Sequence, residues 1–281
     1  MSIKSFNGNA IRDFFSECQV DRFYLLLKLP SRPNKKALNI GEHLLYLNRF
    51  EGDLSLDGYY EDLTPRALLS TGNCFNFKRR LWAGGSINHY KPLEFNKHYI
   101  CQENIRYVKE VKGTQYVGIE RIIFETSKLN GVTKISDEIS LKEMRILAYT
   151  NSGTTINEPN SEETIGTTVV GEFTFNLMDI IRYSQLTLNP HRIHWDKEYS
   201  KSIEGYNDII AQGPFIIQIL AHNLNKIVNN TTITDLKYKN INPIYPDTSV
   251  TILMKQDGNK LRLIMANNSI MFAELIATCN K

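Results

Sequence analysis

Two of the chain's six histidines stand three residues apart in the stretch YSQLTLNPHRIHWDKEY, residues 183–199. His191 and His194 follow an Asn-Pro pair and precede an Asp. Histidine changes its charge near neutral pH, so an imidazole can take up a proton and return it. An amide such as that of Asn189 can hold a water or a hydroxyl beside such a base. The spacing therefore favours an acid–base site made by Asn189 and His194.

Two other interpretations of the pair are weaker. A stable zinc site needs three or four ligands, and no cysteine or third histidine lies nearby in the sequence, so a metal site is not favoured. Most histidines in loops carry no chemistry at all. We expect that structural role for the chain's isolated histidines, which are His43, His89, His98 and His222.

A second feature follows in QGPFIIQILAHNLNKIVN, residues 212–229, where apolar side chains recur at helical spacing. The N–H groups at a helix N-terminus are free and carry partial positive charge. Pro214 has no N–H, so Gly213, with Gln212 before it, is the expected donor to a developing oxyanion. A base beside an oxyanion donor is what abstraction of the α-proton of a thioester requires.

The segments around these residues show two kinds of spacing between apolar side chains, one typical of strands and one typical of a helix. Strand-like runs at 99–113, 114–131 and 133–149, with Asn-Gly between the last two, predict an antiparallel meander. The helix at 212–229 is followed by strand-like runs at 232–240, 249–258 and 260–279. A helix wrapped by such a sheet is a hotdog unit, so we expect an α+β double hotdog.

The expected organisation has three parts. Residues 1–149 form a degenerate N-terminal hotdog unit with a helical extension over about 1–50, and its central helix is expected around TPRALLS, residues 64–70. Residues 150–165, which are rich in Gly, Asn, Ser, Thr and Glu, are the expected linker. Residues 166–281 form the catalytic hotdog unit.

Composition narrows the class of protein. Apolar residues make up 42% of the 281 residues, which supports a packed core. The net charge of +3 is too small for the concentrated basic face of a nucleic-acid-binding protein. The four cysteines form no C-x-x-C pair, which favours a reducing compartment. No apolar run reaches the roughly 20 residues that span a bilayer.

The stretch 183–196 resembles the signature of MaoC-like hydratases, the (R)-specific enoyl-thioester hydratases of type 2. The segment GYNDIIAQGPFIIQIL, residues 205–220, is similar to the family's next segment, and RRLWAGGSINHYKPL, residues 79–93, resembles a motif of two-domain members. Many bacterial members have Asp where Asn189 stands. His191 falls where the family has a small polar residue, so the resemblance gives it no catalytic role.

The resemblance implies a reversible dehydration of a (3R)-hydroxyacyl thioester, with no metal and no other cofactor. Gly213 would polarise the thioester carbonyl, His194 would move the proton, and Asn189 would hold the hydroxyl. One active site per chain is expected, in the C-terminal half. Trp82 and the small residues after it would make room for an acyl chain. The residues expected to bind substrate are Trp82, Gly84, Gly85, Arg192 and Gln212.

The implied partners are acyl-carrier protein or coenzyme A thioesters, and a homodimer is allowed. Fungal mitochondrial members of the family imply the mitochondrial matrix, with the cytoplasm as the alternative. The N-terminal stretch MSIKSFNGNAIRDFF is basic and amphipathic like a presequence, although an ordinary helix explains it equally. Two other functions stay open: a hotdog acyl-thioesterase and a non-catalytic acyl-binding protein.

Overall fold

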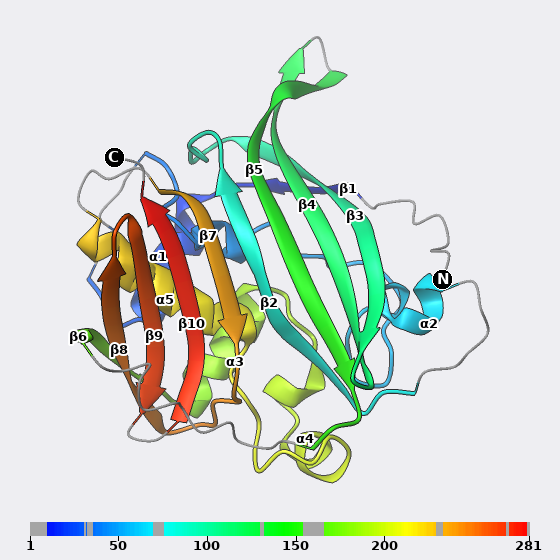
Figure 1. Ribbon diagram of the computed structural model, residues 1–281. Coiled ribbons are helices and arrows are strands. Elements are labelled where there is room, and N and C mark those ends of the chain that lie inside the picture. Colours follow the sequence, from blue (N-terminus) through cyan, green and yellow to red (C-terminus); the bar gives the residue numbers. More distant parts are fainter. Residues whose placement is uncertain are drawn as a thin grey trace.

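The computed structural model describes residues 10–30, 32, 36–69, 76–129, 132–153, 166–228, 233–267 and 270–279. In this part of the chain, one antiparallel sheet has the strand order β1-β3-β4-β5-β2-β7-β10-β9-β8-β6 (Figure 1). Its strands are β1 (Ala10–Phe14), β2 (Arg79–His89), β3 (His98–Val111), β4 (Thr114–Leu129), β5 (Val132–Thr150), β6 (Thr168–Phe175), β7 (Ile233–Asn240), β8 (Thr248–Asp257), β9 (Lys260–Asn267) and β10 (Ile270–Cys279).

The helices are short except for one, and Figure 1 shows α1, α3 and α5 behind the sheet. The α-helices are α1 (Glu17–Leu26), α2 (Pro65–Leu68), α3 (Leu177–Leu186), α4 (Lys197–Ser202) and α5 (Gly213–Ile227). Single 3-10 turns are η1 (Glu42–Leu45), η2 (Glu61–Leu63) and η4 (Arg192–His194).

Helix α5 is the central helix expected from the apolar spacing. Gln212 is its N-cap, proline stands in its first turn, and its buried residues include Phe215, Leu220 and Leu224. It contacts β2, β7, β9 and β10. Full burial of one such apolar side chain stabilises the fold by about 1.5–3 kcal/mol. The helix is therefore held firmly against the sheet, and its first turn has a defined position.

The two halves of the chain join along β2 and β7. Gly84 pairs with Lys239 and Gly85 pairs with Tyr238 in this antiparallel contact. A Cβ on Gly84 would lie 2.6 Å from the carbonyl oxygen of Tyr238. The small residues thus allow the strand from the first half to approach the strand from the second half, and the sheet continues across the junction.

Three expectations about elements are wrong. Residues 10–14 form strand β1 paired with β3, and not part of a helix, because the free edge of β3 offers backbone hydrogen bonds that helical spacing does not reveal. The helix at TPRALLS has only the four residues Pro65–Leu68. The run 260–279 is two strands, β9 and β10, which pair with each other. The Asn-Gly turn at 130–131 and most of the expected linker lie outside the described residues.

Candidate active site

The segment between α3 and α5 carries the two histidines of the acid–base motif. After α3 ends, Leu188 has a left-handed φ of 52°, which turns the chain out of the helix. The Asn189 N–H then donates to the Ser184 carbonyl at 2.8 Å. The Oδ1 atom of Asn189 accepts the N–H of His191 at 3.1 Å, as in an Asx turn. These bonds fix the loop from which the two histidines project.

His194 is 6% exposed, and its Nδ1 lies 2.8 Å from the carbonyl oxygen of Ile210. A carbonyl only accepts, so Nδ1 carries the proton, and Nε2 of the neutral ring carries the lone pair. Burial, together with a smaller effect of the neighbouring His191, lowers the pKa of His194 to about 3. His194 is therefore uncharged near neutral pH, which is the form that a general base needs.

A cavity of about 460 Å³ opens beside this ring. Asn189, His194 and Gly213 all line it, together with Trp82 from β2. The structure thus brings the three residues of the expected catalytic set to one cavity, with one wall supplied by the N-terminal half of the chain.

Gly213 lies at the start of the 15-residue helix α5. Its N–H makes no hydrogen bond to another described residue. A Cβ at this position would lie 2.6 Å from Asn240 Nδ2 and 3.1 Å from Trp82 Cβ. Glycine therefore lets the helix N-terminus, with its partial positive charge, lie directly at the cavity wall.

Trp82 lies between the main cavity and a smaller compartment and forms a wall of both. Its Nε1 donates to the Tyr238 hydroxyl at 3.1 Å, and the Arg145 guanidinium carbon lies 4.7 Å from its ring centre. A smaller compartment of about 60 Å³ also contacts Trp82 and Asn189. The indole is thus fixed on both sides, as a residue that shapes a binding cavity must be.

The other residues expected to bind substrate lie elsewhere. Gly84, Gly85, Gln212 and Arg192 are not among the described residues that line the main cavity. Gly85 is packed so that a Cβ would clash with the Met144 carbonyl oxygen. Their roles in binding stay predictions, and the geometry gives the two glycines a part in strand packing.

Gln212 and Arg192 have structural contacts instead. The side chain of Gln212 is fully buried, and its Nε2 donates to the Ile180 carbonyl at 2.8 Å, which ties α5 to α3. Arg192 pairs with Asp196 at 2.7 Å and lies 4.1 Å over the ring of Tyr199. Both residues therefore position the loop and the helix that carry the site.

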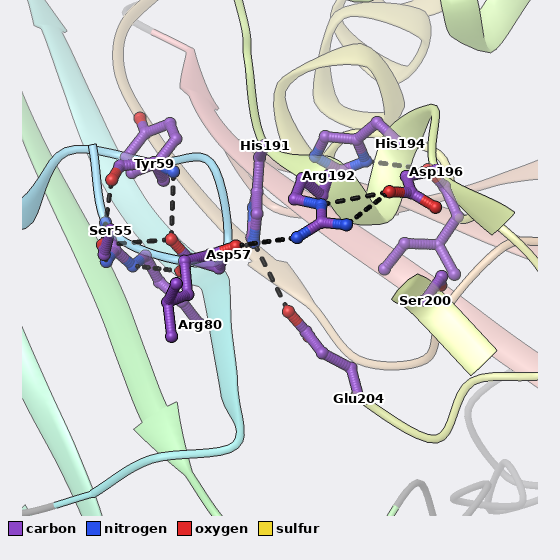
Figure 2. A network of polar contacts seen from close by, with 12 residues as sticks. Ser55, Asp57, Tyr59, Arg80, His191, Arg192, His194, Asp196, Ser200 and Glu204 are labelled. Atoms are coloured by element: carbon purple, nitrogen blue, oxygen red, sulfur yellow. Dashed lines mark hydrogen bonds and ion pairs between the residues drawn. The ribbon is translucent and has the colours of Figure 1, made fainter. Parts of the chain in front are cut away.

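Sequence reasoning missed three charged residues around His191, which Figure 2 shows together. Asp57 Oδ2 and Glu204 Oε1 each lie 3.7 Å from His191 Nε2, and Arg80 Nε lies 3.1 Å from Asp57 Oδ2. Asp57 lies in GDLSLDGYYED, a run whose composition indicates only a turn. No local signal in the sequence points to Asp57 or Glu204, because only the tertiary fold brings them to the histidine loop, whereas Arg80 lies in the motif at residues 79–93.

No group of three or more His, Cys, Asp or Glu side chains suited to a metal ion occurs in the described part of the chain. The rings of His191 and His194 meet edge to face, with their centres 5.4 Å apart. The described residues also include no helix long and apolar enough to cross a membrane.

The fold and the site define a double-hotdog protein in which a neutral histidine and the N-terminus of a buried helix lie at one cavity. Among solved structures, the chain resembles a MaoC-like dehydratase from Phytophthora capsici, with a TM-score of 0.68, 9% identity and coverage of 98% of this chain and 96% of that one. It also resembles a double-hotdog protein from Mycobacterium tuberculosis, with a TM-score of 0.55, 10% identity and coverage of 98% and 97%. The expected double-hotdog fold is thereby confirmed.

The sequence gives a closer assignment. Residues 41–246 match the family model of hydroxyacyl-thioester dehydratase type 2. The chain is 38% identical to the mitochondrial hydroxyacyl-thioester dehydratase type 2 of Saccharomyces cerevisiae over 246 residues, which cover 86% of each protein. The chain therefore belongs to the hydroxyacyl-thioester dehydratase type 2 family, and the resemblance found in its motifs is confirmed.

Proposed function

We propose that this protein interconverts a (3R)-hydroxyacyl thioester and a trans-2-enoyl thioester plus water. The proposal rests on the protonation and the position of the His194 ring. Its Nδ1 is bonded to the Ile210 carbonyl, and its neutral ring lines the same cavity as Asn189 and the Gly213 end of α5. A base, a polar amide and a helix N-terminus around one cavity are the parts that this dehydration needs.

Each residue has a separate role in the proposed reaction. The Gly213 N–H polarises the thioester carbonyl, which acidifies the α-carbon, and a donor of this kind contributes about 10²–10³ in rate. The Nε2 lone pair of His194 removes the α-proton, for which a positioned base contributes about 10²–10⁴. Because Asn189 Oδ1 accepts the His191 N–H, its Nδ2 is the atom left to hold the β-hydroxyl.

The proposal is favoured over thioester hydrolysis by the residues at the cavity. A hotdog thioesterase needs a carboxylate or another nucleophilic group aimed at the carbonyl. Among the described residues, no Asp, Glu or Cys lines the main cavity. Its Ser and Thr hydroxyls, those of Thr114, Thr150 and Ser152, have no hydrogen bond to a described histidine or carboxylate that could activate them. Dehydration needs no such group, because the thioester itself takes up the charge that develops on its oxygen.

The cellular context extends the proposal. The relative from Saccharomyces cerevisiae is named as a mitochondrial enzyme, and we infer the mitochondrial matrix for this chain as well. Acyl-carrier protein or coenzyme A would carry the acyl group, and a homodimer is the inferred assembly. A fluorescent fusion of the full chain tests the location, and a purely cytosolic signal would contradict it while leaving the chemistry intact.

The reaction is tested by hydration of crotonyl and longer enoyl thioesters, which is measured as the loss of enoyl absorbance. We expect His194→Ala and His194→Gln to lower the rate by about 10²–10⁴, because both remove the base. The glutamine amide can still donate to the Ile210 carbonyl, so the hydrogen bond from this position to the Ile210 carbonyl can be kept. His98→Ala, at an exposed histidine of β3, is the matched control and should keep full activity. Normal hydration by a folded His194→Gln protein would refute the proposed mechanism.

A further inference from the structure

His191 has an environment unlike that of its neighbour. Its ring is 6% exposed, and its Nε2 lies 3.7 Å from Asp57 Oδ2 on one side and 3.7 Å from Glu204 Oε1 on the other (Figure 2). Asp57 is 6% exposed and Glu204 is fully buried. Two buried carboxylates from distant parts of the chain therefore converge on one ring nitrogen.

Other charged and polar groups surround the two acids beside His191. Arg80 Nε lies 3.1 Å from Asp57 Oδ2, and the Tyr199 hydroxyl interacts with Glu204. A buried carboxylate is unfavourable unless a charge or hydrogen bonds compensate it. An N–H at His191 Nε2 would point between the two acids, so Asp57 and Glu204 fix the orientation of this ring.

The same ring also reaches the substrate cavity. His191 lines the cavity with Asn189 and His194. Because Nε2 is turned to the two acids, Nδ1 is the nitrogen left to donate into this cavity. The backbone bond from the His191 N–H to Asn189 Oδ1 holds this ring next to the amide that would bind the hydroxyl.

From this geometry we propose that His191 is a second catalytic residue, the acid that protonates the leaving β-hydroxyl, and that Asp57 and Glu204 are positioning residues that hold its ring for this role. The proposal rests on the dehydratase function proposed above and names a further participant in that reaction. It replaces the expectation that His194 alone moves both protons and that His191 has no catalytic role.

The step balances. His194 Nε2 takes the α-proton, and the electrons of that C–H bond form the new double bond. The C–O bond of the β-carbon breaks, and the leaving hydroxyl takes the Nδ1 proton of His191 to become water. His194 ends protonated and His191 ends neutral. A proton then passes from His194 to His191, whose ring centres are 5.4 Å apart, through the water in the cavity, which restores the starting state.

The different surroundings of the two rings suit opposite roles. His194 faces the Ile210 carbonyl, and burial lowers its pKa to about 3, so it stays a free base. His191 faces the carboxylates of Asp57 and Glu204. Two rings with different surroundings at one cavity are suited to separate roles as acid and base. The amide of Asn189 cannot supply the acid proton.

The first experiment compares two leaving groups. Hydroxide must be protonated as it leaves, whereas chloride needs no acid. We expect His191→Ala and His191→Asn to lower dehydration of a 3-hydroxybutyryl thioester by about 10²-fold or more. Elimination from the 3-chlorobutyryl thioester, above the spontaneous rate, should be nearly unchanged. His194→Gln should lower both rates alike, because both reactions need the base.

The outcomes separate this inference from the proposed function. Equal loss on both substrates in a folded His191→Asn protein would overturn the acid role of His191 and leave the dehydratase reaction standing. Full activity of His194→Gln on both substrates would instead overturn the proposed function itself. Circular dichroism spectra and thermal midpoints show which variants are folded, and the asparagine variant serves where alanine disturbs the loop.

The second experiment tests Glu204 with the same pair of substrates. Glu204 Oε1 lies 3.7 Å from His191 Nε2, whereas Glu198 is an exposed acid of α4. If Glu204 positions the acid, Glu204→Gln should lower dehydration of the 3-hydroxybutyryl thioester and leave elimination from the 3-chlorobutyryl thioester nearly unchanged. Glu198→Gln is the control and should leave both rates unchanged. Equal loss on both substrates in a folded Glu204→Gln protein would show that Glu204 only supports the fold.

Discussion

Asn189 is the residue of the expected catalytic set whose side chain also bonds within the histidine loop. Its Oδ1 accepts the His191 N–H at 3.1 Å, and its own N–H donates to the Ser184 carbonyl. The residue thus shapes the histidine loop as well as lining the cavity. An aspartate could make the same Oδ1 contact, so the exchange would alter charge with little change in geometry.

We expect Asn189→Asp to keep substantial hydratase activity and to shift its pH dependence. A carboxylate at this wall of the cavity stabilises the imidazolium form of His194, so the pKa of His194 should rise from its value of about 3. The acid limb of the rate profile should then move to higher pH, because the base becomes protonated earlier. A profile unchanged from wild type in the folded variant would contradict an electrostatic contact between residue 189 and His194. Asn104→Asp, at an exposed asparagine of β3, controls for the change in net charge.

Among the elements, β2 and β7 form the junction on which the position of the cavity wall depends. Gly84 and Gly85 lie on β2 against β7, and the Tyr238 hydroxyl at this junction accepts the indole N–H of Trp82. The junction therefore sets the position of the cavity wall. Any displacement of β2 would move Trp82 relative to the N-terminus of α5.

We expect Gly84→Ala to destabilise the protein and to lower activity on short and long enoyl thioesters alike. The added Cβ would lie 2.6 Å from the Tyr238 carbonyl oxygen, which is backbone and cannot turn aside. Overpacking of this kind costs about 1–3 kcal/mol. Thermal unfolding and rates on two chain lengths measure the effect, with Ser86→Ala on the same strand as the control. Selective loss of the long substrate would instead support the role of the glycine in binding an acyl chain.

For the molecule as a whole, buried histidines tie stability to pH. His43 is 1% exposed, and burial lowers its pKa to about 3, although Glu143 opposes the shift. Between that pKa and the ordinary value of 6.5, the unfolded chain binds a proton that the folded chain does not. Stability from such a group is complete above the unfolded pKa and is lost as pH falls through this window. His194 behaves in the same way.

We expect the free energy of unfolding to fall as pH is lowered from about 6.5 toward 4, by on the order of 1 kcal/mol per pH unit for each fully buried neutral histidine. His43→Gln should flatten the slope by one such contribution, because an amide takes up no proton. Urea unfolding at several pH values measures the slope. His98→Gln, at an exposed histidine, should leave the slope as it is, and an equally steep slope in His43→Gln would contradict the assignment.

The sequence by itself determined the parts of this protein that depend on local pattern. Alternation and turn residues predicted most strands, and apolar spacing with a Gly-Pro start predicted α5. The stretch from Asn189 to His194 indicated both of these residues as site residues, because residues close in the chain stay close in space. The helix start at Gly213 was predictable for the same reason, since capping and dipole effects act within one turn.

Tertiary structure alone decided what surrounds those residues. Strand β1 takes its conformation from the free edge of β3, although its own spacing is equally helical. The carboxylates of Asp57 and Glu204 meet at His191 from positions 147 residues apart in the numbering, because the 50s loop of the first half packs on the histidine loop of the second. Charge, burial and hydrogen bonding act through space, and so the different surroundings of His194 and His191 arise only once the two halves are packed together.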